Sequence, residues 1–93
     1  MDFASDESYE EMISTLQSFL NEAEEECSTM QSAGQDCVDN TENDPAAAKA
    51  NEGLQGCVEG IRSACETIQG IVSALQDELE RIHEATAKAD SLG

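Results

Sequence analysis

Two stretches of this 93-residue chain place apolar residues at alternating spacings of four and three residues, the spacing of a coiled-coil seam. In the first half the spacing continues from Tyr9 to Cys37, and in the second half from Leu54 to Ala89. Most of the acidic residues of the first half fall away from its seam, as expected for the solvent side of a helix. The spacing therefore predicts an all-α chain with two long amphipathic helices.

The segment between the two seams reads as a bend. It contains the only proline, Pro45, and Asp44 directly before it, a pair suited to the N-cap and first position of a helix. We therefore predict an antiparallel two-helix hairpin that forms a single domain over residues 1–93. Its first helix is expected at about 6–39, its bend at about 40–45 and its second helix at about 46–89.

The net charge of −17 limits the kinds of partner. So acidic a surface repels nucleic acid and anionic lipid headgroups, so neither is expected to bind. The chain has no run of eighteen apolar residues, which argues against membrane insertion. Its first residues, M-D-F-A-S-D-E-S, lack the basic start and apolar core of a Sec signal peptide, so synthesis in the cytoplasm and another export route are expected.

A two-helix hairpin of this length buries about one apolar seam, so a protein partner is expected to complete a four-helix bundle. The apolar stripe is wider than one seam, because other residues flank it at sevenfold spacing; a wide intramolecular seam is the alternative explanation. Glycines in the second helix indicate either close approach of a neighbour or a kinked or frayed start of that helix. A second copy of the chain is also a candidate partner. The predicted interface residues are Met12, Phe19, Leu54, Gly56, Gly60 and Ile71.

The four cysteines admit three interpretations. Cys27 with Cys65 and Cys37 with Cys57 are both centred near residues 46 and 47, so a bend there would allow two nested disulfides. Alternatively, the thiols are reduced and act as small apolar residues, or metal sites are shared between chains. Oxidised pairs would suit an alternative function, a self-sufficient disulfide-stapled hairpin in an oxidising compartment.

The sequence offers no pattern typical of an enzyme. His83 is the only histidine, and no spacing indicates a Ser-His-Asp or Cys-His arrangement. Glycine-rich phosphate loops and metal-ligand repeats are not found either. We therefore predict no catalytic, cofactor-binding or metal-binding residues and no cofactor.

About ninety residues, two amphipathic helices and a short acidic bend resemble the small Trp-x-Gly (WXG) proteins of the bacterial type VII (ESX) secretion system. The resemblance is greatest to the degenerate members that act as partners of LXG-domain toxins. Near the bend, Leu54-Gln55-Gly56 and Asn51-Glu52-Gly53 keep only the glycine of the Trp-x-Gly motif. In the family's export signal an aromatic residue precedes an aspartate by four positions; here Thr86 stands in the aromatic place and Asp90 is kept.

This resemblance implies a non-enzymatic targeting chaperone that docks by helix–helix contacts on an LXG-type toxin domain or a sister subunit. It also implies export together with that partner through type VII secretion. The C-x9-C and C-x7-C spacings additionally look like the coiled-coil-helix-coiled-coil-helix (CHCH) proteins, which implies an assembly factor as the alternative.

Overall fold

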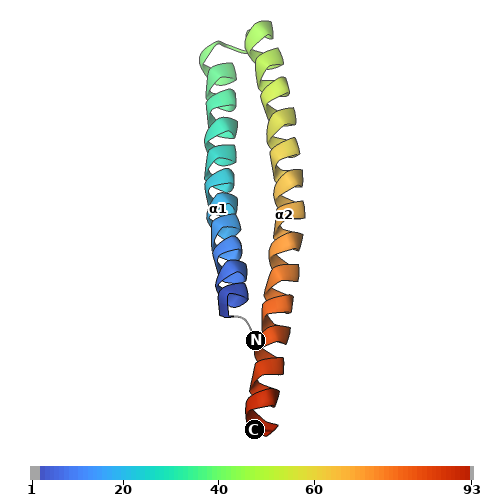
Figure 1. Cartoon of the computed structure of the whole chain (residues 1–93). Helices are drawn as coiled ribbons and strands as arrows, with labels where there is room; N and C mark the ends of the chain where they lie inside the picture. The colour runs from blue at the N-terminus through green and yellow to red at the C-terminus, as the bar shows by residue number, and fades with distance from the viewer. Residues whose placement is uncertain (1–2, 93) are drawn as a thin grey trace.

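The computed structural model describes the backbone of residues 3–92 and the side chains of residues 6–92. Helix α1 spans Phe3–Asn40 and helix α2 spans Pro45–Leu92. The two helices lie side by side and antiparallel in a rod of 73 × 15 × 15 Å (Figure 1). The predicted all-α helical hairpin is confirmed.

Both helices are longer than predicted. α1 begins three residues earlier and ends one residue later than expected, and α2 continues three residues further. No proline occurs before Pro45 and no glycine before Gly34, so nothing in the sequence interrupts α1 over its first thirty residues or more.

The chain reverses in four residues, 41–44. Two of them, Glu42 and Asn43, have left-handed backbone conformations with φ of 55° and 62°. The backbone N–H of Asn43 donates to the Val38 carbonyl oxygen at 3.0 Å, which closes the end of α1. Asp44 Oδ2 then accepts hydrogen bonds from the N–H groups of Ala46 and Ala47 at 3.1 and 3.3 Å, so it caps α2 as the sequence predicts.

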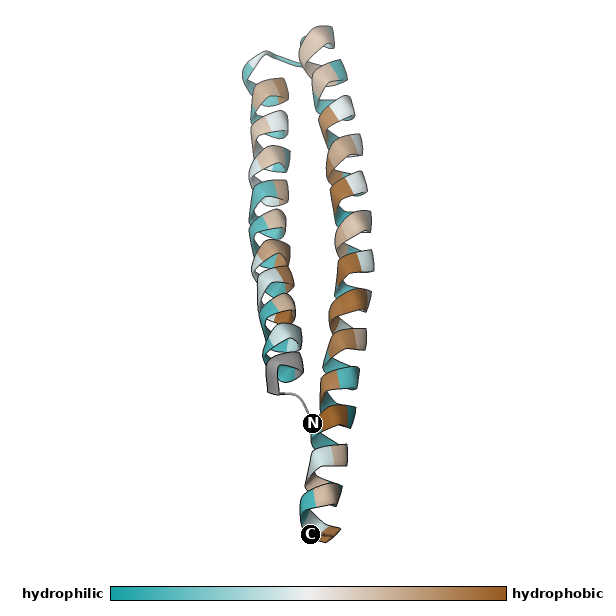
Figure 2. Ribbon diagram, in the orientation of Figure 1, coloured by the Kyte–Doolittle hydropathy of each residue, from teal (hydrophilic) through white to brown (hydrophobic). Residues whose placement is uncertain are grey.

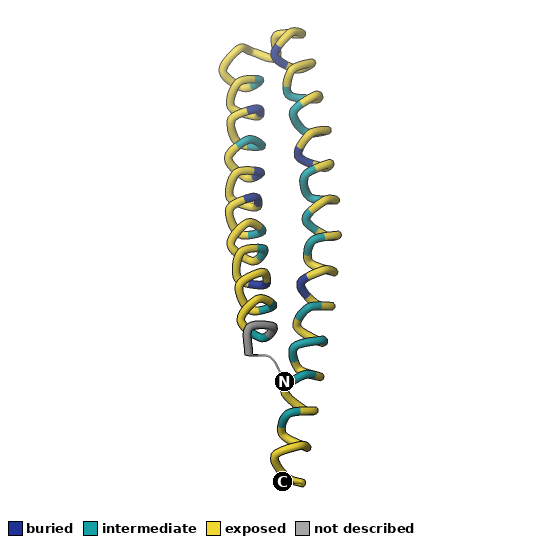
Figure 3. Tube along the Cα trace, viewed as in Figure 1, coloured by how far each residue is buried: buried dark blue, intermediate teal, exposed yellow. Residues whose placement is uncertain are grey.

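The core is a single seam between the two helices. Buried positions lie on the sides of α1 and α2 that face each other (Figure 3). Strongly hydrophobic residues recur along α2 (Figure 2). Val58, Val72 and Cys27 are the most deeply buried side chains. The buried apolar residues are Ile13, Ala23, Cys27, Ala47, Val58 and Val72.

The predicted seam of α1 is wrong at its last position. Cys37 is exposed and Val38 is half-buried in its place. A straight α-helix turns by about 20° per heptad relative to a strict seven-residue repeat, so after four heptads the residue after the expected one faces the partner helix. In α2 the seam begins earlier than predicted, since Ala47 is already buried.

Cross-helix contacts define the antiparallel register. Gln31 hydrogen-bonds to Gln55, and Glu24 pairs with Arg62. In both pairs the residue numbers add to 86, so the hairpin is centred on residue 43. The predicted centre at 46 to 47 is wrong, because Pro45 already belongs to α2 and the reversal precedes it.

Because α1 is shorter than α2, the C-terminal part of α2 runs past the start of α1 (Figure 1). Asp6, in the first turn of α1, lies against His83 of α2. The residues of α2 that follow run toward and past the start of α1, and those nearest Leu92 form an overhang. Leu92 at its end is 89% exposed.

The seam predicts a sharp contrast between two neighbouring residues of α2. Val72 is 0% exposed and Ile71 is 43% exposed. Val72→Ala should lower the free energy of unfolding by about 2 kcal/mol, because it removes two buried methyl groups and leaves a cavity. Ile71→Ala should cost less than about 1 kcal/mol. Urea unfolding followed by circular dichroism measures both, and equal losses would contradict the seam.

The cap at Asp44 gives a second test of the fold. Asp44→Ala should lower the free energy of unfolding by about 1 kcal/mol, because the N–H groups of Ala46 and Ala47 lose their acceptor. Asp44→Asn keeps an acceptor oxygen and serves as the control, with a change of no more than a few tenths of a kcal/mol expected. Thermal unfolding at fixed protein concentration would contradict the cap if the two variants were equally destabilised.

Candidate functional site

One side of the hairpin carries polar contacts between the helices, and we call it the polar face. Gln31 Nε2 donates to Gln55 Oε1 at 3.3 Å, and Arg62 donates to Glu24 Oε1 and Gln31 Oε1, both at 3.1 Å. The Arg62 and Glu24 side chains are 39% and 64% exposed, so their ion pair contributes little to stability. These contacts show which side of each helix forms this face.

The opposite side of the hairpin is apolar, and we call it the apolar face. The polar contacts come from residues that directly follow a seam position. Residues that directly precede a seam position are rotated by about 100° in the opposite sense, so they lie on the other side of the seam. On α1 these include Met12 and Phe19, and on α2 they include Ile71. Their exposed fractions are 49%, 48% and 43%, which are large values for apolar side chains.

Near the turn, the apolar face is hollowed. An open depression there is lined almost wholly by apolar groups from both helices, with Ala33 of α1 opposite Ala50 of α2. Its remaining lining residues are Gly34, Cys37, Ala47, Asn51 and Leu54. The apolar face therefore combines a shallow groove at one end with exposed large side chains further along.

The predicted interface residues fall at different places. Met12, Phe19 and Ile71 lie together on the apolar face, since Ile71 is level with Thr15, between the other two. Leu54 is half-buried in the seam and lines the depression. Gly60 is exposed at the margin of the apolar face, while Gly56 lies further round α2, away from α1.

A second row of residues at alternating spacings of three and four runs along α2 on this face. All its members are exposed, and most are small: Ala46, Ala50, Gly53, Cys57, Gly60, Ala64, Thr67, Ile71 and Ala74. The prediction from sequence included only part of this row, because alanine, glycine and threonine give little hydrophobic signal. The regular spacing was the signal that could have revealed it.

Two glycines of this row make no close contact with other described residues. A Cβ atom added at Gly53 or at Gly60 would meet no other atom within 4 Å. Glycine in a helix costs about 1 kcal/mol relative to alanine, and no packing inside the hairpin offsets that cost here. Gly34 differs, because an added Cβ would collide with Asn51 where the two helices approach closely.

Acidic residues also lie on the apolar face of α1. Glu22 and Glu26 directly precede the seam residues Ala23 and Cys27 and are exposed. On α2, Glu59 and Glu66 directly follow seam residues and so lie toward the polar face. Arg62 is bound to Glu24 on the polar face and Arg81 to Glu78 of its own helix.

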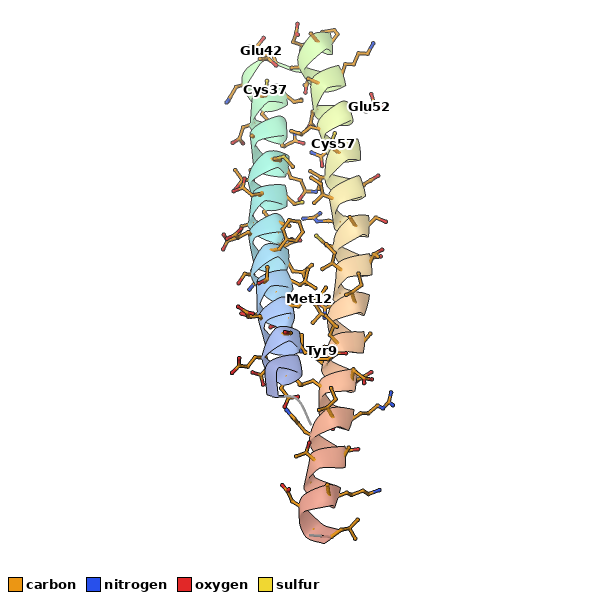
Figure 4. The ribbon with its side chains drawn as sticks, in the orientation of Figure 1. Tyr9, Met12, Cys37, Glu42, Glu52 and Cys57 are labelled. Carbon is orange, nitrogen blue, oxygen red and sulfur yellow. The ribbon has the colours of Figure 1, made fainter. Side chains whose placement is uncertain are left out.

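The cysteines do not form the predicted pairs, and all four are free. In the observed register Cys65 lies six residues beyond the position level with Cys27, an offset of about 9 Å along the helix, and Cys57 lies eight residues, about 12 Å, from the level of Cys37. Figure 4 shows Cys37 close to the turn and Cys57 further along α2. A disulfide needs Cα atoms within roughly 7 Å, so both predicted pairings are wrong.

The far end of the hairpin carries the chain's only histidine. His83 Nε2 lies 3.4 Å from Asp6 Oδ2 and so links the two helices near the start of α1. Thr86 and Asp90, the predicted remnant of an export signal, line an open depression on the overhang together with these two residues. Across residues 6–92, no group of three or more His, Cys, Asp or Glu side chains is arranged to hold a metal ion.

No family model matches the chain, and neither a curated protein nor a solved structure matches it. Within residues 3–92, neither helix has a stretch apolar enough to cross a membrane.

Differences in thiol exposure can be tested directly. Cys37 and Cys57 are exposed, Cys65 is half-buried and Cys27 is only 1% exposed. Under native reducing conditions we expect rapid alkylation of the first two, slower alkylation of Cys65 and protection of Cys27. Peptide mass mapping after a short iodoacetamide pulse identifies the sites, and the urea-unfolded chain, with four equally reactive thiols, is the control. Rapid native labelling of Cys27 would contradict the buried seam.

Proposed function

We propose that this chain is a non-enzymatic interaction protein, a WXG-like small partner and targeting chaperone of an LXG-type toxin secreted through the type VII system. It acts by docking its helical hairpin onto helices of the toxin domain or of a sister subunit, giving a four-helix bundle. The observation that carries this proposal is the apolar face, where Met12, Phe19 and Ile71 are about half exposed with no neighbouring element of the described chain to cover them.

The size of the exposed surface supports the need for a partner. The hairpin exposes 6635 Å², whereas a compact protein of its mass, 9.9 kDa, exposes roughly 5,200 Å². Specific protein–protein interfaces bury about 800 Å² of each partner, so the excess of about 1,400 Å² is larger than one standard interface would cover. A docked helical partner would therefore bring the exposed area of this chain closer to that of an ordinary globular protein.

The hairpin shape and the position of the overhang are compatible with the type VII part of the proposal. Asp90 is exposed near the end of α2, so a receptor could reach it while the apolar face holds the partner. We propose that the protein is made in the bacterial cytoplasm and leaves it together with its partner.

The alternative, a self-sufficient hairpin held by two disulfides or a CHCH-like assembly factor, has less support. Both alternatives need facing cysteine pairs, and the register offsets the two predicted pairs by about 9 and 12 Å. Without these disulfides, the stability of a self-sufficient hairpin would depend on the one narrow seam alone.

Co-expression with each neighbouring open reading frame tests the proposed function. We expect a stable complex of this chain with a helical protein, eluting as a single peak whose mass is measured by light scattering. The double variant Met12→Glu/Phe19→Glu should abolish the complex, because it places two charges on the apolar face.

Gln17→Glu/Gln69→Glu is the matched control, since it adds the same two charges on the polar face and should leave the complex intact. A chain that remains monomeric beside every neighbouring gene product, and beside LXG-domain proteins of its host, would overturn the proposal.

A further inference from the structure

We infer that the apolar face binds, along its length, one amphipathic helix of another protein whose seam of small apolar residues is flanked by Lys and Arg. This inference rests on the proposed function as an interaction protein and adds the site and the chemistry of the partner. The face consists of Met12 and Phe19 on α1, the row from Ala46 to Ala74 on α2 and the depression near the turn.

The first argument is the shape of the face. Along α2 it offers small residues at alternating three and four residue spacing, which lets the backbone of a docked helix approach closely and in a matching repeat. Gly53 and Gly60 contribute open space that nothing within the described chain fills. Met12, Phe19 and Ile71 stand at one end of the face as large side chains that a partner would cover.

The second argument is length. From Ala50 to Ala74 the row covers 24 residue steps, or about 36 Å of helix. This distance matches a partner helix of about 24 residues. A short peptide or a small molecule would leave most of the face uncovered.

The third argument is charge, and it separates a foreign helix from a second copy. Glu22 and Glu26 lie on this face of α1, and neither takes part in an ion pair among the described residues. A second copy would bring another net charge of −17 and acids at the same positions. Flanking Lys and Arg residues of a partner would instead oppose these acids across the interface.

A synthetic helix tests the partner chemistry without knowledge of the natural partner. The probe is a peptide of about 24 residues with Ala and Leu along one heptad stripe and Lys beside it. Fluorescence anisotropy should show binding at least about tenfold tighter than that of a scrambled peptide with the same composition and charge, and tighter at low salt than at high salt. A second peptide with the same stripe but Glu beside it should not bind.

Matched variants of the chain locate the binding site. Ala64→Gln and Gly60→Gln fill the small-residue row and should each weaken binding of the Lys-flanked peptide about tenfold. Ala48→Gln makes the same change as Ala64→Gln on the polar face and should leave binding unchanged. Gly60→Gln should also raise the thermal midpoint of the free chain, because glutamine favours a helix more than glycine does, so weaker binding would not reflect unfolding.

The outcomes separate this inference from the proposed function. A natural partner that still binds the Ala64→Gln and Gly60→Gln variants would overturn the assignment of the face but keep the interaction function. Equal binding of the Lys-flanked and scrambled peptides would overturn the partner chemistry. A dimer of this chain that Ala64→Gln dissociates would show that a second copy occupies the face and would overturn the inference.

Discussion

Everything in this hairpin depends on one narrow seam between two helices. A seam of alternating spacings buries one stripe of each helix and leaves the rest of both helices in solvent. Only six apolar side chains among the described residues are buried, and half of them are alanine or cysteine. The seam is therefore sufficient to align two helices, but it leaves an unusually large surface exposed for the chain's mass.

The turn decides which residues meet across that seam. The left-handed residues Glu42 and Asn43 reverse the chain, and the Asp44 cap starts α2 at Pro45, so the hairpin is centred on residue 43. A shift of the centre by three or four residues changes the sum of paired residue numbers by six to eight. In an extended hairpin this moves every cross-helix pair by two turns of helix, and it separates the cysteines that a symmetrical count would pair.

The two sides of the seam differ in polarity, and this difference makes one side the better surface for binding another protein. The polar face satisfies its own side chains through Arg62, Glu24, Gln31 and Gln55. Among the described residues, no side-chain hydrogen bond joins the two helices on the apolar face, which gathers the large exposed side chains and the small-residue row. Because no third helix within residues 3–92 covers it, the apolar face is exposed to solvent and available to another protein.

The sequence by itself determined the fold class, the cap at Asp44 and most of the seam. These features follow from local signals: heptad spacing, an Asp-Pro pair and helix propensity. It also placed Met12, Phe19 and Ile71 beside the seam, because heptad position fixes the side of the helix on which a residue lies.

Three features were decided only by the tertiary structure. They are the register of the two helices, the position of Val38 rather than Cys37 in the seam, and the location of the apolar flanks of both helices on the same face. The register depends on the backbone path through a four-residue turn, and the shift at Cys37 on the twist accumulated over four heptads. The common face depends on how one helix is rotated against the other. Each of these properties belongs to the pair of helices, and neither helix alone contains it.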